Sequence, residues 1–188
     1  MAFVMKASRD DVTAMRHAYS ILLLPVMNSI VIPTVILLLT QGERGFGIGT
    51  GKLFSVFGAL LSATLLIAGV AMIMHSIALF VRHGNGTLAP WDPTQALVIR
   101  GLYRYLRNPM KMGLILLLLG ESIAFGSLPL LYWWATFTIV NVVYIRLWEE
   151  PGLRIRFGEE YARYCSQVGP WLPSRRPWRA SNNMVESR

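Results

Sequence analysis

The sequence has few charged residues and only one cysteine. Charged side chains make up 15% of its 188 residues, and Cys165 is the lone cysteine. A soluble globular domain carries about 25% charged residues, so this composition excludes an ordinary soluble domain. A single cysteine also excludes any disulfide within the chain. Apolar residues take the place of the missing charge, because 54% of the chain is hydrophobic.

Two long stretches lack charged residues altogether. None lies between Arg16 and Glu43, and His75 is the only ionisable side chain between Lys52 and Arg82. Each stretch exceeds the ~20 residues that span a hydrocarbon core, so we predict a transmembrane helix in each. The first stretch is longer than the ~7–15-residue apolar core of a cleavable signal peptide, and we expect it to stay in the mature protein.

A third apolar interval indicates two more transmembrane helices. Between Met112 and Ile145 the only charged residue is Glu121, and the sequence Gly-Ser-Leu-Pro at 126–129 favours a tight turn. We therefore predict an all-α, polytopic membrane protein with four transmembrane helices, a cytoplasmic connecting loop and a C-terminal amphipathic helix. It would form a single membrane domain, divided into an N-terminal arm (1–18), two transmembrane helices (19–81), a core that includes a helical hairpin at 109–148 and the C-terminal helix (82–173), and a flexible tail (174–188).

Lysine and arginine are distributed unevenly among the connections. They are concentrated in the N-terminal arm, in the loop at 82–107 and in the tail, whereas the connection at 42–52 has two and the hairpin tip has none. Basic residues are enriched in cytoplasmic loops, so we predict that both termini and the loop at 82–107 are cytoplasmic. The net charge of +8 fits contact with anionic headgroups better than nucleic-acid binding.

The third predicted helix has a clear signal at its start. Asn108 is a favoured N-cap residue, and Pro109 is a favoured first helical residue. The free amides and positive dipole end of the first turn suit a carboxylate or a ribose hydroxyl. Gly113 and Gly120 share one face, which we expect to pack against the fourth helix or to admit a flat ligand. Glu121 is either a hydrogen-bonded packing residue or a substrate contact.

The fourth predicted helix ends in the paired carboxylates of Glu149 and Glu150. A hairpin must leave the membrane on the side where it entered, so we expect these carboxylates to lie near Asn108 and its basic neighbours, around a cofactor pocket. A polar line along one face of this helix is predicted from a spacing of four, seven and eight residues, and its members are Asn141, Ile145, Trp148 and Glu149.

A further helix is predicted from Pro151 onward. Gly158 should bend it, because glycine weakens a helix. We expect this amphipathic helix to lie on the membrane or to cap the connecting loop. Its apolar stripe consists of Leu153, Phe157, Tyr161, Tyr164 and Val168.

In order and spacing, these features resemble the C-terminal half of the isoprenylcysteine carboxyl methyltransferase and phospholipid methyltransferase group of integral membrane enzymes. The similar stretch runs from about Gly86 to Pro173. Its landmarks are the segment 101–110 (GLYRYLRNPM), Gly113, Gly120, Glu149, Glu150, Leu153, the segment 157–161 (FGEEY), Tyr164 and the segment 171–173 (WLP).

The resemblance implies an enzyme that uses S-adenosylmethionine as its methyl donor and acts on a membrane lipid or prenyl-type acceptor. It implies a catalytic set in which Arg104 or Arg107 orients the acceptor and Glu150 also takes part. It implies no metal. The cofactor-binding set that it implies is Tyr103, Arg107, Asn108, Pro109, Lys111, Gly113, Glu149, Glu150 and Tyr161.

Two residues depart from the pattern of this family. Asn108 stands where the family usually has histidine, and Lys111 stands where it usually has tyrosine. Asparagine can hydrogen-bond but cannot act as a general base near neutral pH. Lys111 would repel a sulfonium unless it points outward, meets the methionyl carboxylate or reaches a lipid phosphate.

Because a carboxylate acceptor needs no base, the sequence favours carboxylate methylation, as in isoprenylcysteine O-methylation. Methylation of a phospholipid amine is the first alternative. An NADPH-dependent reductase of the sterol type and a non-enzymatic relative are further alternatives. The sequence leaves the oligomeric state open.

Overall fold

The computed structural model describes residues 23, 25–42, 52–83, 97 and 99–179, and the regular secondary structure in this part of the chain is all helical, which confirms the predicted all-α class. The predicted N-terminal arm, the connection at 43–51 and most of the connecting loop lie outside the described residues. The elements are η1 (Met27–Val31), α2 (Ile32–Leu39), α3 (Lys52–His83), η2 (Gly101–Arg104), α4 (Pro109–Phe125), α5 (Leu128–Tyr144), η3 (Ile145–Glu149) and α6 (Glu150–Gln167).

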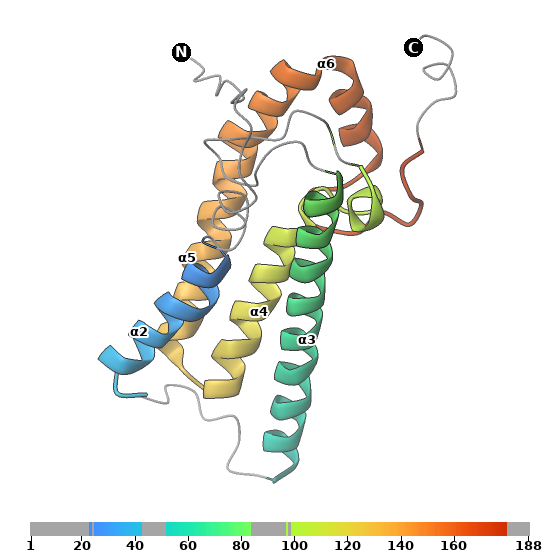
Figure 1. Ribbon diagram of the computed structural model, residues 1–188. Coiled ribbons are helices and arrows are strands. Elements are labelled where there is room, and N and C mark those ends of the chain that lie inside the picture. The colour runs from blue at the N-terminus through green and yellow to red at the C-terminus, as the bar shows by residue number, and fades with distance from the viewer. Residues whose placement is uncertain (1–22, 24, 43–51, 84–96, 98, 180–188) are drawn as a thin grey trace.

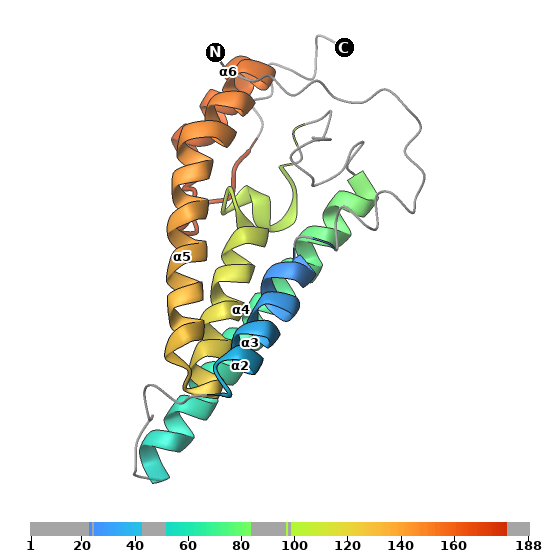
Figure 2. The same cartoon turned by 90° about the vertical axis from the view of Figure 1, so that its left-hand side faces the viewer.

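The helices α2, α3, α4 and α5 run lengthwise beside one another, and α6 extends beyond them at one end (Figures 1 and 2). Helix α4 contacts both α3 and α5, and α2 packs on α5. Two continuous helical segments, Ser55–Leu79 and Leu128–Gln167, are long and apolar enough to cross a membrane, whereas Met27–Leu39 is apolar but shorter. The described part of the chain is therefore of the all-α class with two candidate spans, and the full count of four spans stays a prediction.

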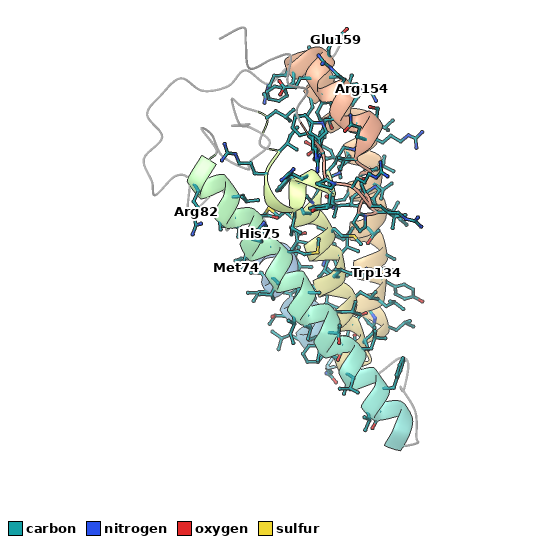
Figure 3. All side chains as sticks on the ribbon, turned by 90° about the vertical axis from the view of Figure 1, so that its right-hand side faces the viewer. Met74, His75, Arg82, Trp134, Arg154 and Glu159 are labelled. Atoms are coloured by element: carbon teal, nitrogen blue, oxygen red, sulfur yellow. The ribbon has the colours of Figure 1, made fainter. Side chains whose placement is uncertain are left out.

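Helix α3 exposes large apolar side chains along its outer face. Met74, for example, points away from the bundle in Figure 3. An apolar surface of this extent is costly in water but matches a hydrocarbon environment, which is consistent with an integral membrane protein. Other exposed members of this face are Val56, Phe57, Leu60, Ile67 and Val70.

The contact between α3 and α4 is built on small residues. A Cβ atom added to Gly69 would lie 2.7 Å from the carbonyl oxygen of Gly113, and one added to Gly113 would lie 2.9 Å from the carbonyl oxygen of Gly69. The predicted packing of the small face of α4 against the fourth helix is therefore wrong. Helix α3 is the partner because it has its own buried small residues at intervals of seven, namely Ser62, Gly69 and Ser76.

The predicted turn between α4 and α5 is confirmed. Gly126 ends α4 in the left-handed conformation, with φ of 60°. Ser127 then caps α5, because its side chain accepts a hydrogen bond from the backbone N–H of Leu130. This tight turn makes α4 and α5 a hairpin, so the start of α4 and the end of α5 lie at the same end of the bundle (Figure 1).

Helix α5 does not stop at the paired glutamates. It continues through the π turn η3 into α6. A π turn inserts one extra residue into the helical repeat and so rotates the face that follows. Ile145 is buried, whereas Trp148 is 63% exposed. The predicted shared face is therefore wrong, and the Asn141 amide instead donates to the carbonyl of Phe137 on its own helix.

The bend at Gly158 is confirmed, because this residue has φ of 53° and ψ of −130° inside α6. Beyond the bend, α6 packs over the connecting segment. Tyr161, Tyr164 and Val168 are buried there, and Leu97, Ile99 and Trp178 pack against them. The expectation that this helix caps the connecting loop is confirmed for these described residues.

The segment after α6 returns to the start of α4. The backbone N–H of Ser174 donates to the carbonyl of Tyr105 at 2.7 Å, and that of Trp178 donates to the carbonyl of Arg104 at 2.8 Å. The tail predicted to begin at 174 therefore includes residues that are tied to η2 and packed under α6. The sequence did not reveal this contact, because short backbone hydrogen bonds leave no residue pattern.

Candidate functional site

Two ion pairs join the start of α4 to the end of α5. Arg107 Nη1 lies 2.6 Å from Glu150 Oε1, and Lys111 Nζ pairs with Glu149 Oε2. The predicted meeting of the segment at 107–113 with the paired glutamates is thus present in the structure. This juxtaposition defines the candidate site, which lies where the hairpin ends meet α6.

Arg107 is held on two sides. Its side chain is 10% exposed, and Nη1 donates both to Glu150 and to the Cys165 thiol, the latter at 2.9 Å. Burial disfavours its charge, but the nearby Cys165 and Glu150 outweigh that effect and raise the pKa of Arg107. Its buried Nε has no hydrogen-bond partner within the described part of the chain. Arg107 is thus a fixed cation whose Nε–H group has no partner among the described residues.

Asn108 occupies the N-cap position of α4 but does not cap it. Its side chain makes no capping hydrogen bond, and its amide nitrogen donates instead to the carbonyl of Pro170 at 3.2 Å. The predicted capping by the Asn108 side chain is therefore wrong, although Pro109 does begin the helix and is buried. The first-turn N–H groups consequently donate no hydrogen bond to the Asn108 side chain and keep their capacity for an anionic group.

Lys111 contacts two groups on the α5 side. Besides its pair with Glu149, Nζ lies 5.2 Å from the ring centroid of Tyr144, within cation–π range. The Tyr144 ring in turn stacks on Trp148, with 6.3 Å between ring centroids. The sequence does not predict a role for Tyr144 because this residue lies five residues before Glu149. Five is the hydrogen-bond interval of a π turn rather than of an α-helix.

The remaining predicted site residues belong to the frame around these pairs. The Tyr103 carbonyl accepts a hydrogen bond from the Tyr164 hydroxyl at 2.5 Å, and burial raises the pKa of Tyr103. Arg104 Nε donates to the carbonyl of Trp178 at 3.2 Å. Tyr161 is a buried residue of α6, and Gly113 lies in the contact with α3. Contacts of these residues with cofactor or substrate stay predictions.

His75 on α3 also supports this frame rather than standing alone. A Cβ atom added to Gly101 would lie 2.4 Å from His75 Nε2, and Gly101 has φ of 54°. The imidazole therefore contacts the backbone at the start of η2. Within the described ranges, no group of three or more His, Cys, Asp or Glu side chains could hold a metal ion.

The fold has two helical segments long and apolar enough to cross a membrane, and two ion pairs lie where the ends of the α4–α5 hairpin meet. The sequence model of the phospholipid methyltransferase family matches residues 57–160, more than half of the chain, and this range contains both ion pairs. The chain belongs to the phospholipid methyltransferase family and is a membrane methyltransferase that uses S-adenosylmethionine. No curated protein matches the chain.

Proposed function

We propose that the chain methylates the amine headgroup of a phospholipid-type acceptor, in the site between the start of α4 and the paired glutamates. The observation that supports this proposal is the pairing of Arg107 with Glu150. The arginine expected to orient an acceptor carboxylate is already neutralised by a partner in its own chain. The other carboxylate, Glu149, and the Tyr144 ring already hold the cationic Lys111 side chain, so this pair of groups suits positive ligands.

The residues present fit S-adenosylmethionine, which supplies its methyl group from a cationic sulfonium. Glu149 and Glu150 would hold its ammonium or its ribose hydroxyls by charge-assisted hydrogen bonds. The first-turn amides of α4 suit its carboxylate. Arg107 Nε, which is buried and has no partner among the described residues, provides a further donor for its polar groups.

The acceptor would reach this site from the bilayer beside Trp148. Leu147 and Trp148 are both exposed next to Glu149, and tryptophan favours the headgroup level of a membrane. An amine must lose a proton before it attacks, and Glu149 and Glu150 would be the bases that accept it. Positioning of the two reactants would supply most of the acceleration.

A carboxylate acceptor is the second candidate, and Arg104 favours it. Among the residues that the structure describes, its guanidinium bonds through Nε alone, to the Trp178 carbonyl. The other N–H groups of an arginine can bind a carboxylate as a pair. The absence of histidine at position 108 also favours an acceptor that needs no base. The family assignment favours methyl transfer over reduction by NADPH.

The test is to incubate membranes containing the full chain with S-adenosylmethionine that carries a deuterated methyl group, and to analyse the lipids by mass spectrometry. We expect the label in amine-containing phospholipids, in a form that resists alkaline hydrolysis. A labelled product that loses its methyl group in alkali is an ester and would support the second candidate. No label in any lipid, with the protein folded and cofactor present, would reject both.

A matched pair of variants links the product to this site. Glu150→Gln removes the carboxylate from the site, whereas Glu159→Gln makes the same change on the exposed part of α6 beyond the bend (Figure 3). We expect Glu150→Gln to lower labelling at least about tenfold, as for the loss of one charged contact in a site, and Glu159→Gln to leave it unchanged. Equal labelling by the two variants would place the reaction elsewhere.

A further inference from the structure

We propose that Lys111 is an internal counter-ion that occupies a cation subsite formed by Glu149 and Tyr144, and that a positively charged ligand must displace it. This inference rests on the proposed function. Lys111 Nζ pairs with Glu149 Oε2 and lies 5.2 Å from the centroid of the Tyr144 ring. A carboxylate beside an aromatic face binds an alkylammonium or sulfonium group. The cation of a ligand therefore fits this subsite as well as the ammonium of a lysine does.

The lysine in this subsite is displaceable, unlike its neighbour Arg107. The Lys111 and Glu149 side chains are 26% and 31% exposed, whereas those of Arg107 and Glu150 are 10% and 17% exposed. Arg107 also has a second acceptor in Cys165. The site therefore contains a fixed ion pair, Arg107 with Glu150, and a second pair, Lys111 with Glu149, that solvent and ligands can reach.

The position of Lys111 in α4 lowers the free energy needed to release its ammonium from Glu149. It lies in the first turn of this helix, where the positive end of the dipole disfavours a cation. Its pairing with Glu149 offsets that effect. Its flexible four-carbon stem can carry the ammonium away toward lipid phosphates without moving the helix backbone.

Two sources could supply the displacing cation. S-adenosylmethionine carries both a sulfonium and an ammonium, and an amine phospholipid carries an ammonium in its headgroup. Both sources share a positively charged group that can bind the Glu149 carboxylate and the face of the Tyr144 ring. In either case Lys111 weakens binding in the native chain, because the ligand must first break the internal pair.

The test compares the full chain with its Lys111→Met and Lys111→Arg variants, each purified in detergent. Titration calorimetry measures the affinity for S-adenosylmethionine and for S-adenosylhomocysteine, which keeps the ammonium but has no sulfonium. We expect Lys111→Met to bind up to about fivefold more tightly, the range for loss of a competing partly exposed pair, and Lys111→Arg to stay near the native affinity.

The ligands separate the possible sources. Tighter binding of both nucleosides identifies the ammonium of the donor, and tighter binding of S-adenosylmethionine alone identifies its sulfonium. If only phosphatidylethanolamine in mixed micelles binds more tightly, the acceptor headgroup is the displacing group. Each of these results supports the internal counter-ion.

Unchanged or weaker binding of all three ligands by Lys111→Met, while the native chain binds S-adenosylmethionine, would overturn this inference alone. The ion pair would then only clamp α4 to α5, and the thermal unfolding temperature of the variant should fall. Lys111→Gln, which keeps a polar side chain, provides the same comparison if the methionine variant does not fold. Failure of the native chain and every variant to bind S-adenosylmethionine would overturn the proposed function as well.

Discussion

Arg107 and Glu150 join the backbone just before α4 to the first residue of α6, through a contact of 2.6 Å between Nη1 and Oε1. These residues are 43 positions apart, and the whole hairpin of α4 and α5 lies between them. Because Arg107 also donates to Cys165, this one guanidinium connects three places along the chain. This contact therefore joins the two ends of the hairpin that lie opposite its turn.

Removal of this acceptor should destabilise the protein. Glu150→Ala leaves the buried Arg107 charge without its carboxylate, and we expect a loss of about 2–4 kcal/mol in the free energy of unfolding. Denaturant titration in detergent measures it. Glu159→Ala, at an exposed position on the same helix, is the control and should change that free energy by less than about 0.5 kcal/mol. Similar losses in both variants would contradict a structural role for the pair.

The close contact of α3 with α4 should not tolerate an added methyl group. In Gly113→Ala the new Cβ atom would approach the Gly69 carbonyl oxygen and force the two helix backbones apart. We expect a loss of about 1–3 kcal/mol in the free energy of unfolding. Gly152→Ala is the matched control, since a Cβ atom there meets nothing within 4 Å. Its effect should be neutral or slightly stabilising, because alanine favours a helix.

Replacement of Gly101 should destabilise the protein through two separable effects. Gly101→Ala introduces both a positive φ for a residue with a side chain and a contact with the His75 ring. We expect a lower unfolding temperature, with a loss of about 2–3 kcal/mol in the free energy of unfolding. The double variant with His75→Ala should recover the part due to the ring contact and keep the backbone strain. No recovery would mean that the strain accounts for the whole loss.

Trp178 should hold the C-terminal segment against α6. Its ring meets that of Tyr164 edge-on, with 6.2 Å between centroids, and both of its backbone polar groups bond to Arg104. We expect Trp178→Ala to lower the free energy of unfolding by about 1–3 kcal/mol and to speed proteolysis after α6. Leu172→Ala, at an exposed position in the same segment, should leave both measurements unchanged. An equal effect of the two substitutions would contradict this packing.

The sequence was sufficient for the helices and for the meeting of their ends. The local signals are the uncharged stretches, the turn sequence at 126–129 and Pro109 at the start of a helix. Because the turn is tight, the two helices of the hairpin run side by side and their far ends, at Asn108 and Glu149, must lie close together. The bend at Gly158 was predictable for the same reason, because glycine tolerates dihedral angles that other residues avoid.

Longer-range relationships were not predictable from these local signals. Gly113 and Gly120 mark a face for close packing, but they do not say whether α3 or α5 fills it. The π turn at Ile145–Glu149 has no residue marker, so the faces of Trp148 and Tyr144 were missed. The partner of Lys111 depended on that turn as well, and Glu149 is neither of the two partners predicted, the methionyl carboxylate and a lipid phosphate.

The unbroken passage of α5 into α6 has a mechanical consequence. From Leu128 to the bend at Gly158 the backbone forms one rod, and Glu149 and Glu150 lie along it. A tilt of that rod at its base moves the two carboxylates together, because no bend separates them. The bend at Gly158 comes after the acidic pair, so the angle between the carboxylates and the part of α6 that packs over η2 is set by the backbone of this one glycine.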